Sequence, residues 1–241
     1  MKTCGKILFL LLVISFSGCE LSRNDSGILV FSESFDFSLS QHNWVADFTD
    51  YPSGTDDSAF YELRFAYTDR PENLGERKKS MMLSGCNHSD DLFMFMKRKI
   101  TNLTPNTDYA IVFDVELASN APKGAVGIGG APGEGVYLKA GASSTEPRKV
   151  IEGDQYSLSI DKGNQSAPGE NTVILGDIAV DYETKDYTLI TRNNASISNS
   201  PFIAKSNSKG ELWLIVGTDS GFEGNTTLYY TRINIIFSTS Q

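Results

Sequence analysis

The segment Tyr109-Ala-Ile-Val-Phe-Asp-Val-Glu-Leu117 decides the fold class of this chain. Every odd-numbered position in it holds a large apolar residue, whereas Asp114 and Glu116 fall on the opposite face. Alternation with a period of two is the pattern of a β-strand that has one buried face and one solvated face. Near the C-terminus, residues 229–237 alternate similarly, with Tyr229 placed on the apolar side. Both stretches therefore predict half-buried strands.

Further strand candidates extend along the rest of the chain, and turn-forming stretches rich in Gly, Pro, Asn and Asp separate them. The candidates are residues 28–31, 60–67, 80–83, 92–100, 135–140, 156–160, 172–180, 187–191 and 211–217. The turn-forming stretches are residues 102–106, 121–124, 163–169 and 219–225. No long apolar stripe at helical spacing and no internal repeat occurs. We therefore expect residues 28–241 to form one all-β domain, an antiparallel β-sandwich of the jelly-roll type.

The N-terminus carries a targeting signal. Lys2 and Lys6 precede an apolar run over residues 7–14, and small residues follow directly before Cys19. This order of a charged region, a short apolar region and a small-residue cleavage site predicts a signal peptide. The apolar run is too short to cross a bilayer as a helix.

The residues Phe16-Ser17-Gly18-Cys19 resemble the bacterial lipobox, with Phe16 where Leu is commonest. The resemblance implies a signal peptide over residues 1–18, followed by Cys19 carrying fatty acyl chains such as palmitate. A short polar tether would then occupy residues 19–27. The lipobox resemblance also implies that the protein is a membrane-anchored lipoprotein of the bacterial cell envelope. Glu20 favours the outer membrane or the cell surface. The alternative is a plain secreted protein that is cleaved nearby.

Composition and charge exclude several function classes. The chain has 241 residues and a net charge of −9. Loss of residues 1–18 would remove two lysines and no acidic residue, so the mature chain would be more acidic still. This acidity argues against nucleic acid as a partner. Only three Cys and two His are present, which leaves little material for zinc, haem or Cys/His catalysis. Once Cys4 has left with the signal and Cys19 is acylated, Cys86 has no partner for an internal disulfide.

The stretch from Lys99 to Asp114 contains a Leu-x-Pro-Asn-Thr-x-Tyr corner between two strands. It resembles the corresponding part of galactose-binding-like jelly-roll carbohydrate-binding modules, although fibronectin type III domains use the same corner. This resemblance implies a β-sandwich and favours sugar binding. The mature chain also resembles an uncharacterised family of bacterial lipoproteins, which implies a compartment but no chemistry. Its residues 85–95, 127–141, 161–166 and 212–224 carry that second resemblance.

Catalytic patterns are weak. Asp219-Ser220-Gly221 looks like a protease nucleophile segment, but neither His42 nor His88 lies in a matching histidine motif. The glycine run over residues 127–135 fails as a phosphate cradle because Pro132 stands in place of the third glycine. Paired carboxylates could hydrolyse a glycosidic bond, and the loops offer acidic residues for it. Those residues are Glu134, Asp219 and Glu223.

Two polar turns are better candidates for binding. Asn87, Asp90 and Asp91 gather the oxygen ligands that Ca²⁺ prefers, so the first turn predicts a structural calcium site, with His88 as a neighbouring ligand-binding residue. An Asx-rich turn that caps its own backbone is the alternative. The second turn could bind sugar hydroxyls or be a solvated loop. Its residues are Asp161, Lys162, Asn164 and Gln165.

Aromatic residues could supply a flat platform for a sugar ring. Trp44 and Tyr51 lie in an irregular stretch and are the candidate platforms, although large aromatics are more often buried. Trp213 lies inside Leu-Trp-Leu-Ile-Val and is interpreted as a core residue. The basic run Lys97-Arg98-Lys99 is interpreted as a solvated edge. Glu134 and Glu223 complete the set of candidate ligand-binding residues.

These observations favour an envelope lipoprotein with a non-catalytic, ligand-binding β-sandwich whose partner is a glycan. One alternative is a structural or adhesive envelope protein that binds other proteins. The other is a glycan-cleaving enzyme that uses loop carboxylates.

Overall fold

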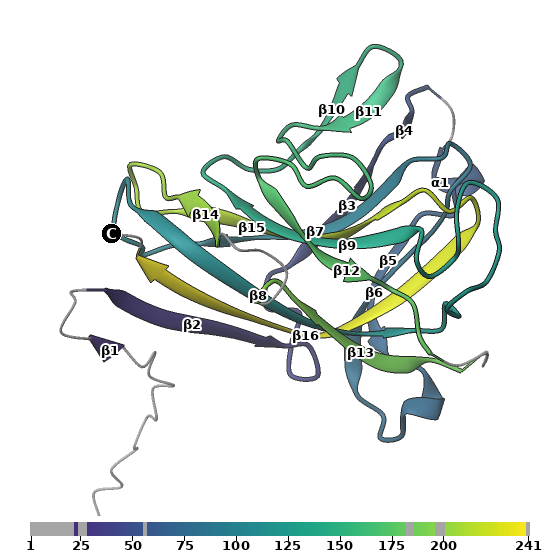
Figure 1. Ribbon diagram of the computed structural model, residues 1–241, viewed down its shortest axis with the longest axis horizontal. Coiled ribbons are helices and arrows are strands. Elements are labelled where there is room, and N and C mark those ends of the chain that lie inside the picture. The colour runs from purple at the N-terminus through teal and green to yellow at the C-terminus, as the bar shows by residue number, and fades with distance from the viewer. Residues whose placement is uncertain (1–21, 24–27, 55–56, 182–185, 196–200, 240–241) are drawn as a thin grey trace, which may run out of the picture.

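The structure is a computed structural model that describes residues 22–23, 28–54, 57–181, 186–195 and 201–239. The predicted signal peptide and Cys19 lie outside these residues. Two antiparallel sheets pack face to face, as the two layers in Figure 1 show. The all-β, antiparallel sandwich predicted from the sequence is confirmed. Among the described residues, no helix is long and apolar enough to cross a membrane.

The first sheet has eight strands, with β16 at its centre. Along one side β16 pairs with β2 and β6, and along the other side it pairs with β8. The eight strands are β1 (Ser22–Arg23), β2 (Leu29–Asp36), β5 (Arg64–Asp69), β6 (Lys79–Cys86), β8 (Asp108–Ser119), β13 (Thr188–Asn193), β14 (Phe202–Lys205) and β16 (Asn225–Thr239). Because β1 pairs with the start of β2, part of the predicted tether belongs to the sheet.

The second sheet has five strands in the order β12 (Thr172–Asp177), β9 (Val136–Ser143), β15 (Leu212–Ser220), β7 (Leu92–Ile100) and β3 (Val45–Thr49). A small third sheet contains β10 (Lys149–Glu152), β11 (Gln155–Leu158) and β4 (Tyr51–Pro52). The short elements α1 (Asp57–Phe60) and η1 (Glu72–Leu74) complete the fold. The predicted strand over residues 60–67 is therefore too long, because α1 occupies its first residue and β5 begins at Arg64.

The main core lies between the inner faces of the first two sheets. The five apolar residues at the odd positions of Tyr109–Leu117 are all fully buried there, as the alternation predicted. The prediction for Tyr229 is wrong, because the register of β16 shifts between Tyr230 and Arg232. This irregularity sends Tyr230 into the core and leaves Tyr229 outside, against Tyr187. Each fully buried large side chain contributes about 1.5–3 kcal/mol to folding.

The outer face of the second sheet is covered over part of its area. Residues 144–171, which we call the cover segment, include the β10–β11 hairpin that rises above this sheet in Figure 1. Leu158 and Ile160 of the cover segment pack on Phe93, Phe95 and Ile215 and form a second, smaller core. Trp213, at the far end of β15, stays partly exposed on this face.

Candidate functional site

Four outward residues of β15 show how the outer face of the second sheet is divided. Trp213, Ile215, Gly217 and Asp219 alternate with the inward residues of the strand. Ile215 is buried under the cover segment, and Asp219 is completely buried at the other end of the strand. Trp213 is only partly buried. The face therefore has a covered half around Asp219 and an open half around Trp213.

The covered half contains a buried group of charges that we call the ion cluster: Asp50, Asp91, Lys139, Lys162 and Asp219. The Oδ2 atom of Asp219 accepts hydrogen bonds from the Nζ atoms of Lys139 and Lys162, each at 2.8 Å, and from the backbone N of Gln165 at 2.9 Å. The Nζ atom of Lys162 also lies 2.8 Å from Oδ2 of Asp50. Because Lys162 and Gln165 belong to the cover segment, these contacts fasten the cover to β15.

Lys139 strengthens the same attachment. Its completely buried Nζ atom donates to the carbonyl oxygens of Lys162 at 2.9 Å and Ala167 at 3.0 Å. Burial lowers the pKa of Lys139, although Asp219 opposes this shift. Burial also opposes the ionisation of Asp219, but the two ammonium groups outweigh it and lower the pKa of that carboxyl. The pair is therefore held in its charged form by mutual contact.

The surroundings of Asp91 raise its pKa, whereas those of Asp219 lower the pKa of that residue. Burial, together with the charges of Asp219 and Asp50, raises the pKa of Asp91 to about 7, although Lys162 acts in the other direction. The carboxyl groups of Asp50, Asp91 and Asp219 offer oxygen atoms that all lie within 4.8 Å of one another. The buried Oδ1 atoms of Asp91 and Asp219 have no other hydrogen-bond partner. A proton held between Asp91 and Asp219 would satisfy both.

Two neighbouring carboxyls with separated pKa values can act as an acid and base pair in glycoside hydrolysis. Here Asp219 has no exposed surface, and three donors already occupy its Oδ2 atom. A substrate would have to displace the cover segment to reach it. The geometry of the ion cluster fits a structural role, in which it holds the cover segment on the sheet, better than a catalytic one.

In the loop of residues 161–169, at the end of the cover segment, most of the predicted ligand-binding side chains are hydrogen-bonded to other groups of the protein. The carboxylate of Asp161 accepts the backbone N–H groups of Glu170 and Gly163, and these bonds lower its pKa. Lys162 is in the ion cluster. Gln165 donates from Nε2 to the carbonyl oxygen of Asp90 at 2.8 Å. Asn164 keeps an exposed side chain, and its backbone pairs with Ala167 of the same loop.

The predicted calcium residues serve different purposes. Asn87 is buried, donates from Nδ2 to the carbonyl oxygens of Ser220 and Phe222, and accepts the backbone N–H of Ser89. Asp91 instead belongs to the ion cluster, where the Lys162 ammonium already lies between two of the carboxylates. Asp90 is exposed. The turn therefore has the geometry of the alternative interpretation, an Asx turn that caps its own backbone.

The remaining candidates meet at one end of the sandwich. Glu134 accepts the backbone N–H of Gly124 through Oε1 at 2.7 Å, and Glu223 donates its backbone N–H to Ile128 at 2.8 Å. His88 lies on the ring of Phe60, with 4.4 Å between the centroids. The polar turns thus converge, as their links through Asn87 and Gln165 also show. Of the predicted platforms, Tyr51 lies near them, because its ring is 5.2 Å from that of Tyr61 and the Tyr61 ring is 5.5 Å from that of His88.

Trp44 and Tyr51 are corrections to the sequence analysis. Trp44 is completely buried between the edges of Phe35 and Phe37, so it offers no face to a ligand. Tyr51 is 3% exposed, and its hydroxyl accepts a hydrogen bond from Lys149. Both rings are core residues because β3, β4 and the cover segment close over a stretch that looks irregular in the sequence.

Trp213 is only partly buried, although the sequence analysis interpreted it as a core residue. It lies opposite Lys99 on β7 and Ser143 on β9. The Nζ atoms of Lys97 and Lys99 are each 5.8 Å from the centre of the Trp213 ring system. Lys97 pairs with Glu146 at 2.8 Å and Lys99 pairs with Glu211 at 3.3 Å. Strict alternation from Leu212 would have placed Trp213 on the outer face, with Ile215.

We call the surface around this ring the Trp213 patch, formed by Lys99, Glu211 and Trp213 together with Glu146 of the cover segment. Lys97 and Ser143 beside it are buried. The patch combines an aromatic ring with ammonium and carboxylate groups. Such a surface suits a ligand that has an apolar face and a polar edge.

No protein-family model matches the sequence, and no curated protein matches it either. Several solved structures are similar to this chain at low sequence identity. A xylan-binding module, CBM15, is 10% identical, with 87% of this chain and 97% of that chain covered and a TM-score of 0.39. A putative sugar binding protein from Bacteroides thetaiotaomicron is 9% identical, with 83% and 90% covered and a TM-score of 0.39.

The enzymatically active domain of tailspike protein 4 from bacteriophage CBA120 is 11% identical, with a TM-score of 0.36. The alignment covers 80% of this chain but only 19% of that one. Similarities at TM-scores below 0.5 say nothing about the ligand.

Proposed function

We propose that this protein is a lipid-anchored protein of the bacterial envelope whose β-sandwich binds a glycan, without cleaving it, at the Trp213 patch. The observation that carries the proposal is the partly exposed ring of Trp213 on the open half of the second sheet. Lys97 and Lys99 lie beside this ring, each with a carboxylate partner.

A pyranose ring has an apolar face that can stack on an aromatic side chain, and its hydroxyls then point sideways. At the Trp213 patch those hydroxyls would meet Glu146 and Glu211. The paired charges are held in place before a ligand arrives, because each lysine is already in contact with a carboxylate. Groups that are fixed in advance lose less conformational entropy on binding.

The two tryptophans of the chain make a direct test possible. We would add soluble polysaccharides to the whole chain in detergent and record tryptophan fluorescence with an iodide quencher. A bound glycan should shield Trp213 from iodide and shift its emission. The Trp213→Phe variant retains only the buried Trp44 and should give no response. If neither fluorescence nor calorimetry changes with any polysaccharide, glycan binding is excluded.

The anchor rests on the lipobox-like residues before Cys19. Each acyl methylene buried in a bilayer contributes about 0.8 kcal/mol, so several chains would hold the domain firmly. Growth with labelled palmitate should label the wild type and the Cys86→Ala variant but leave Cys19→Ala unlabelled. Label on Cys19→Ala, or none on the wild type, would contradict the anchor. Fractionation of the labelled cells tests the proposed location at the outer membrane or surface.

A further inference from the structure

One end of the sandwich exposes large apolar side chains that contribute nothing to the core. Val126 is 98% exposed, Ile128 is 72% exposed and Phe60 is 57% exposed. Exposed apolar residues that occur singly need no explanation, but several at one place indicate an interaction surface. We call this surface the apolar tip and define it by Phe60, His88, Val126 and Ile128.

The loops of the apolar tip are fastened to one another. Phe60 lies on His88, and the neighbouring Asn87 donates to the carbonyl oxygen of Phe222 at 3.1 Å. Ile128 accepts the backbone N–H of Glu223 at 2.8 Å. The connections run without a break from α1, through the turn that holds His88, to the loop that holds Val126 and Ile128. The loops that hold these four side chains are therefore joined to one another.

The glycines near Val126 show how the loop is held. The ring of Phe222 lies so close to Gly127 and Gly224 that a Cβ atom at either position would come within 2.5 Å of it. Further along, the backbone N–H of Gly124 is bound by Glu134, and that of Lys123 is bound by the carbonyl oxygen of Val180. The chain thus fixes this loop while leaving Val126 and Ile128 in solvent.

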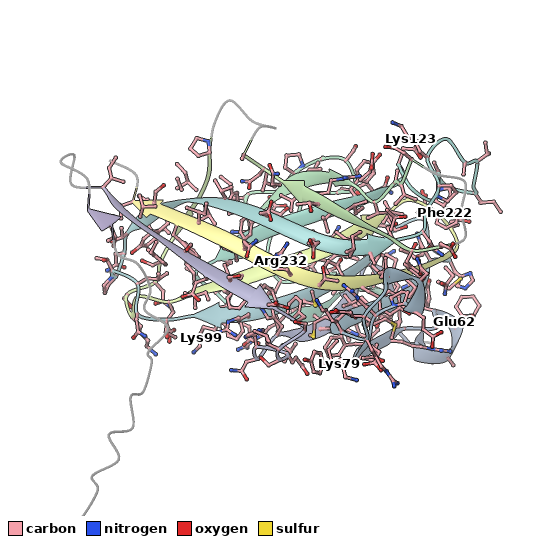
Figure 2. All side chains as sticks on the ribbon, turned by 90° about the horizontal axis from the view of Figure 1, so that it is seen from below. Glu62, Lys79, Lys99, Lys123, Phe222 and Arg232 are labelled. Atoms are coloured by element: carbon pink, nitrogen blue, oxygen red, sulfur yellow. The ribbon has the colours of Figure 1, made fainter. Side chains whose placement is uncertain are left out.

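The charges around the apolar tip are mostly negative. Among the residues that the structure describes, Glu62, Asp90 and Glu223 have no ion-pair partner. Lys123 also lies at this end, and its Nζ atom is 3.8 Å from Oδ1 of Asp181. Figure 2 shows Glu62, Phe222 and Lys123 together at one end of the molecule. Figure 1 places β1 toward the opposite end from α1.

We propose that the apolar tip docks into an apolar pocket of a partner protein whose rim carries lysine and arginine residues. Aromatic and aliphatic side chains at the centre of a contact supply most of its energy, and complementary charges at the rim set specificity and the rate of encounter. A second copy of this chain is disfavoured, since its tip would bring like charges together. An anionic membrane surface is disfavoured for the same reason. The proposal does not depend on glycan binding at the Trp213 patch.

The test uses the full chain in the cells that make it, with a photo-crosslinking amino acid placed at Val126. The matched control position is Leu39, which is 76% exposed but belongs to the turn after β2. We expect an adduct from position 126 and not from position 39. Mapping of the adduct should give a protein segment with basic residues beside apolar ones.

Charge dependence provides the second measurement. In washed envelopes, the adduct yield should fall at least about threefold as salt rises from about 50 mM to about 500 mM, because screening weakens rim contacts. The triple variant Glu62→Gln, Asp90→Asn and Glu223→Gln should reduce the yield similarly. Its control, Glu152→Gln, Asp154→Asn and Glu170→Gln, removes the same charges elsewhere and should not.

Equal adducts at positions 39 and 126, no adduct at 126, or an adduct with lipid, glycan or a second copy of the chain would overturn the proposal. So would a yield that does not respond to salt and to the first triple variant. Unchanged thermal melting of each variant verifies that a lost adduct does not reflect unfolding.

Discussion

The covered and open halves of the second sheet's outer face differ in what lies above the same strands. On β15, Asp219 and Trp213 point in the same direction, yet Asp219 is sealed by the cover segment and Trp213 remains partly exposed. In the covered half, charges meet one another and apolar rings meet Leu158 and Ile160. In the open half, paired charges stand beside a ring. The covered half should therefore govern stability, and the open half should govern binding.

The largest effect should follow from Asp219→Asn, which removes the charge that balances Lys139 and Lys162. Two ammonium groups would then remain buried with insufficient compensation, so we expect a loss of about 3–5 kcal/mol in the free energy of unfolding. Urea unfolding measures it. The control Asp114→Asn lies on the partly exposed outer face of the first sheet and should change stability by less than about 0.5 kcal/mol. Equal effects of both variants would show that the ion cluster does not hold the fold.

Leu158→Ala should weaken the attachment of the cover segment through its apolar contact. Leu158 packs on Phe93 and Phe95, and a buried leucine cut back to alanine costs about 2–3 kcal/mol at a site that can partly collapse. Hydrogen exchange would locate the change. Protection should fall first in residues 149–158 and not in β8 or β16, and a uniform loss would mean that the two cores do not separate.

Stability should also depend on the proton of Asp91. The pKa of this carboxyl is about 7 in the folded protein against an ordinary value of 3.8, so the folded state holds the proton more tightly. Its contribution to stability is complete below about pH 4, declines as the pH rises, and levels off above about pH 7. We expect unfolding measurements on Asp91→Asn to show a flatter profile between these limits. Parallel profiles for wild type and variant would contradict the shared proton.

Trp213→Ala should have the smallest effect on stability and the largest on the proposed binding. Because its ring is only partly buried, we expect a loss of about 1 kcal/mol or less in the free energy of unfolding. Glycan affinity should fall at least about tenfold, the equivalent of about 1.4 kcal/mol. Calorimetry with a glycan that binds the wild type measures this. Affinity that survives the substitution would place the ligand elsewhere.

The two tryptophans show where prediction from the sequence stops. Trp44 lies in an irregular stretch and looks available, whereas Trp213 lies in an apolar run and looks buried. In the structure Trp44 is completely buried, as large aromatics usually are, and Trp213 is partly exposed. Neighbouring residues report which face of a strand a side chain occupies. They do not report whether a distant segment covers that face.

The ion cluster could not have been assembled from the sequence for the same reason. Asp219 contacts Lys162 and Lys139, which are 57 and 80 residues away along the chain. Lys162 was a candidate for binding a ligand and Asp219 for catalysis, since each stands in a polar turn. Their mutual pairing gives both of them a structural use.

The sequence by itself determined the fold class, because a period of two in apolar residues is a local property of the strand and survives without knowledge of its partners. It also contained the lipobox-like residues before Cys19, which are recognised from their order along the chain without knowledge of the fold. Only the tertiary structure decided which outward side chains are free. Burial depends on what packs above them, and here residues 144–171 cover Asp219, Phe93 and Phe95 but leave Trp213 in contact with solvent.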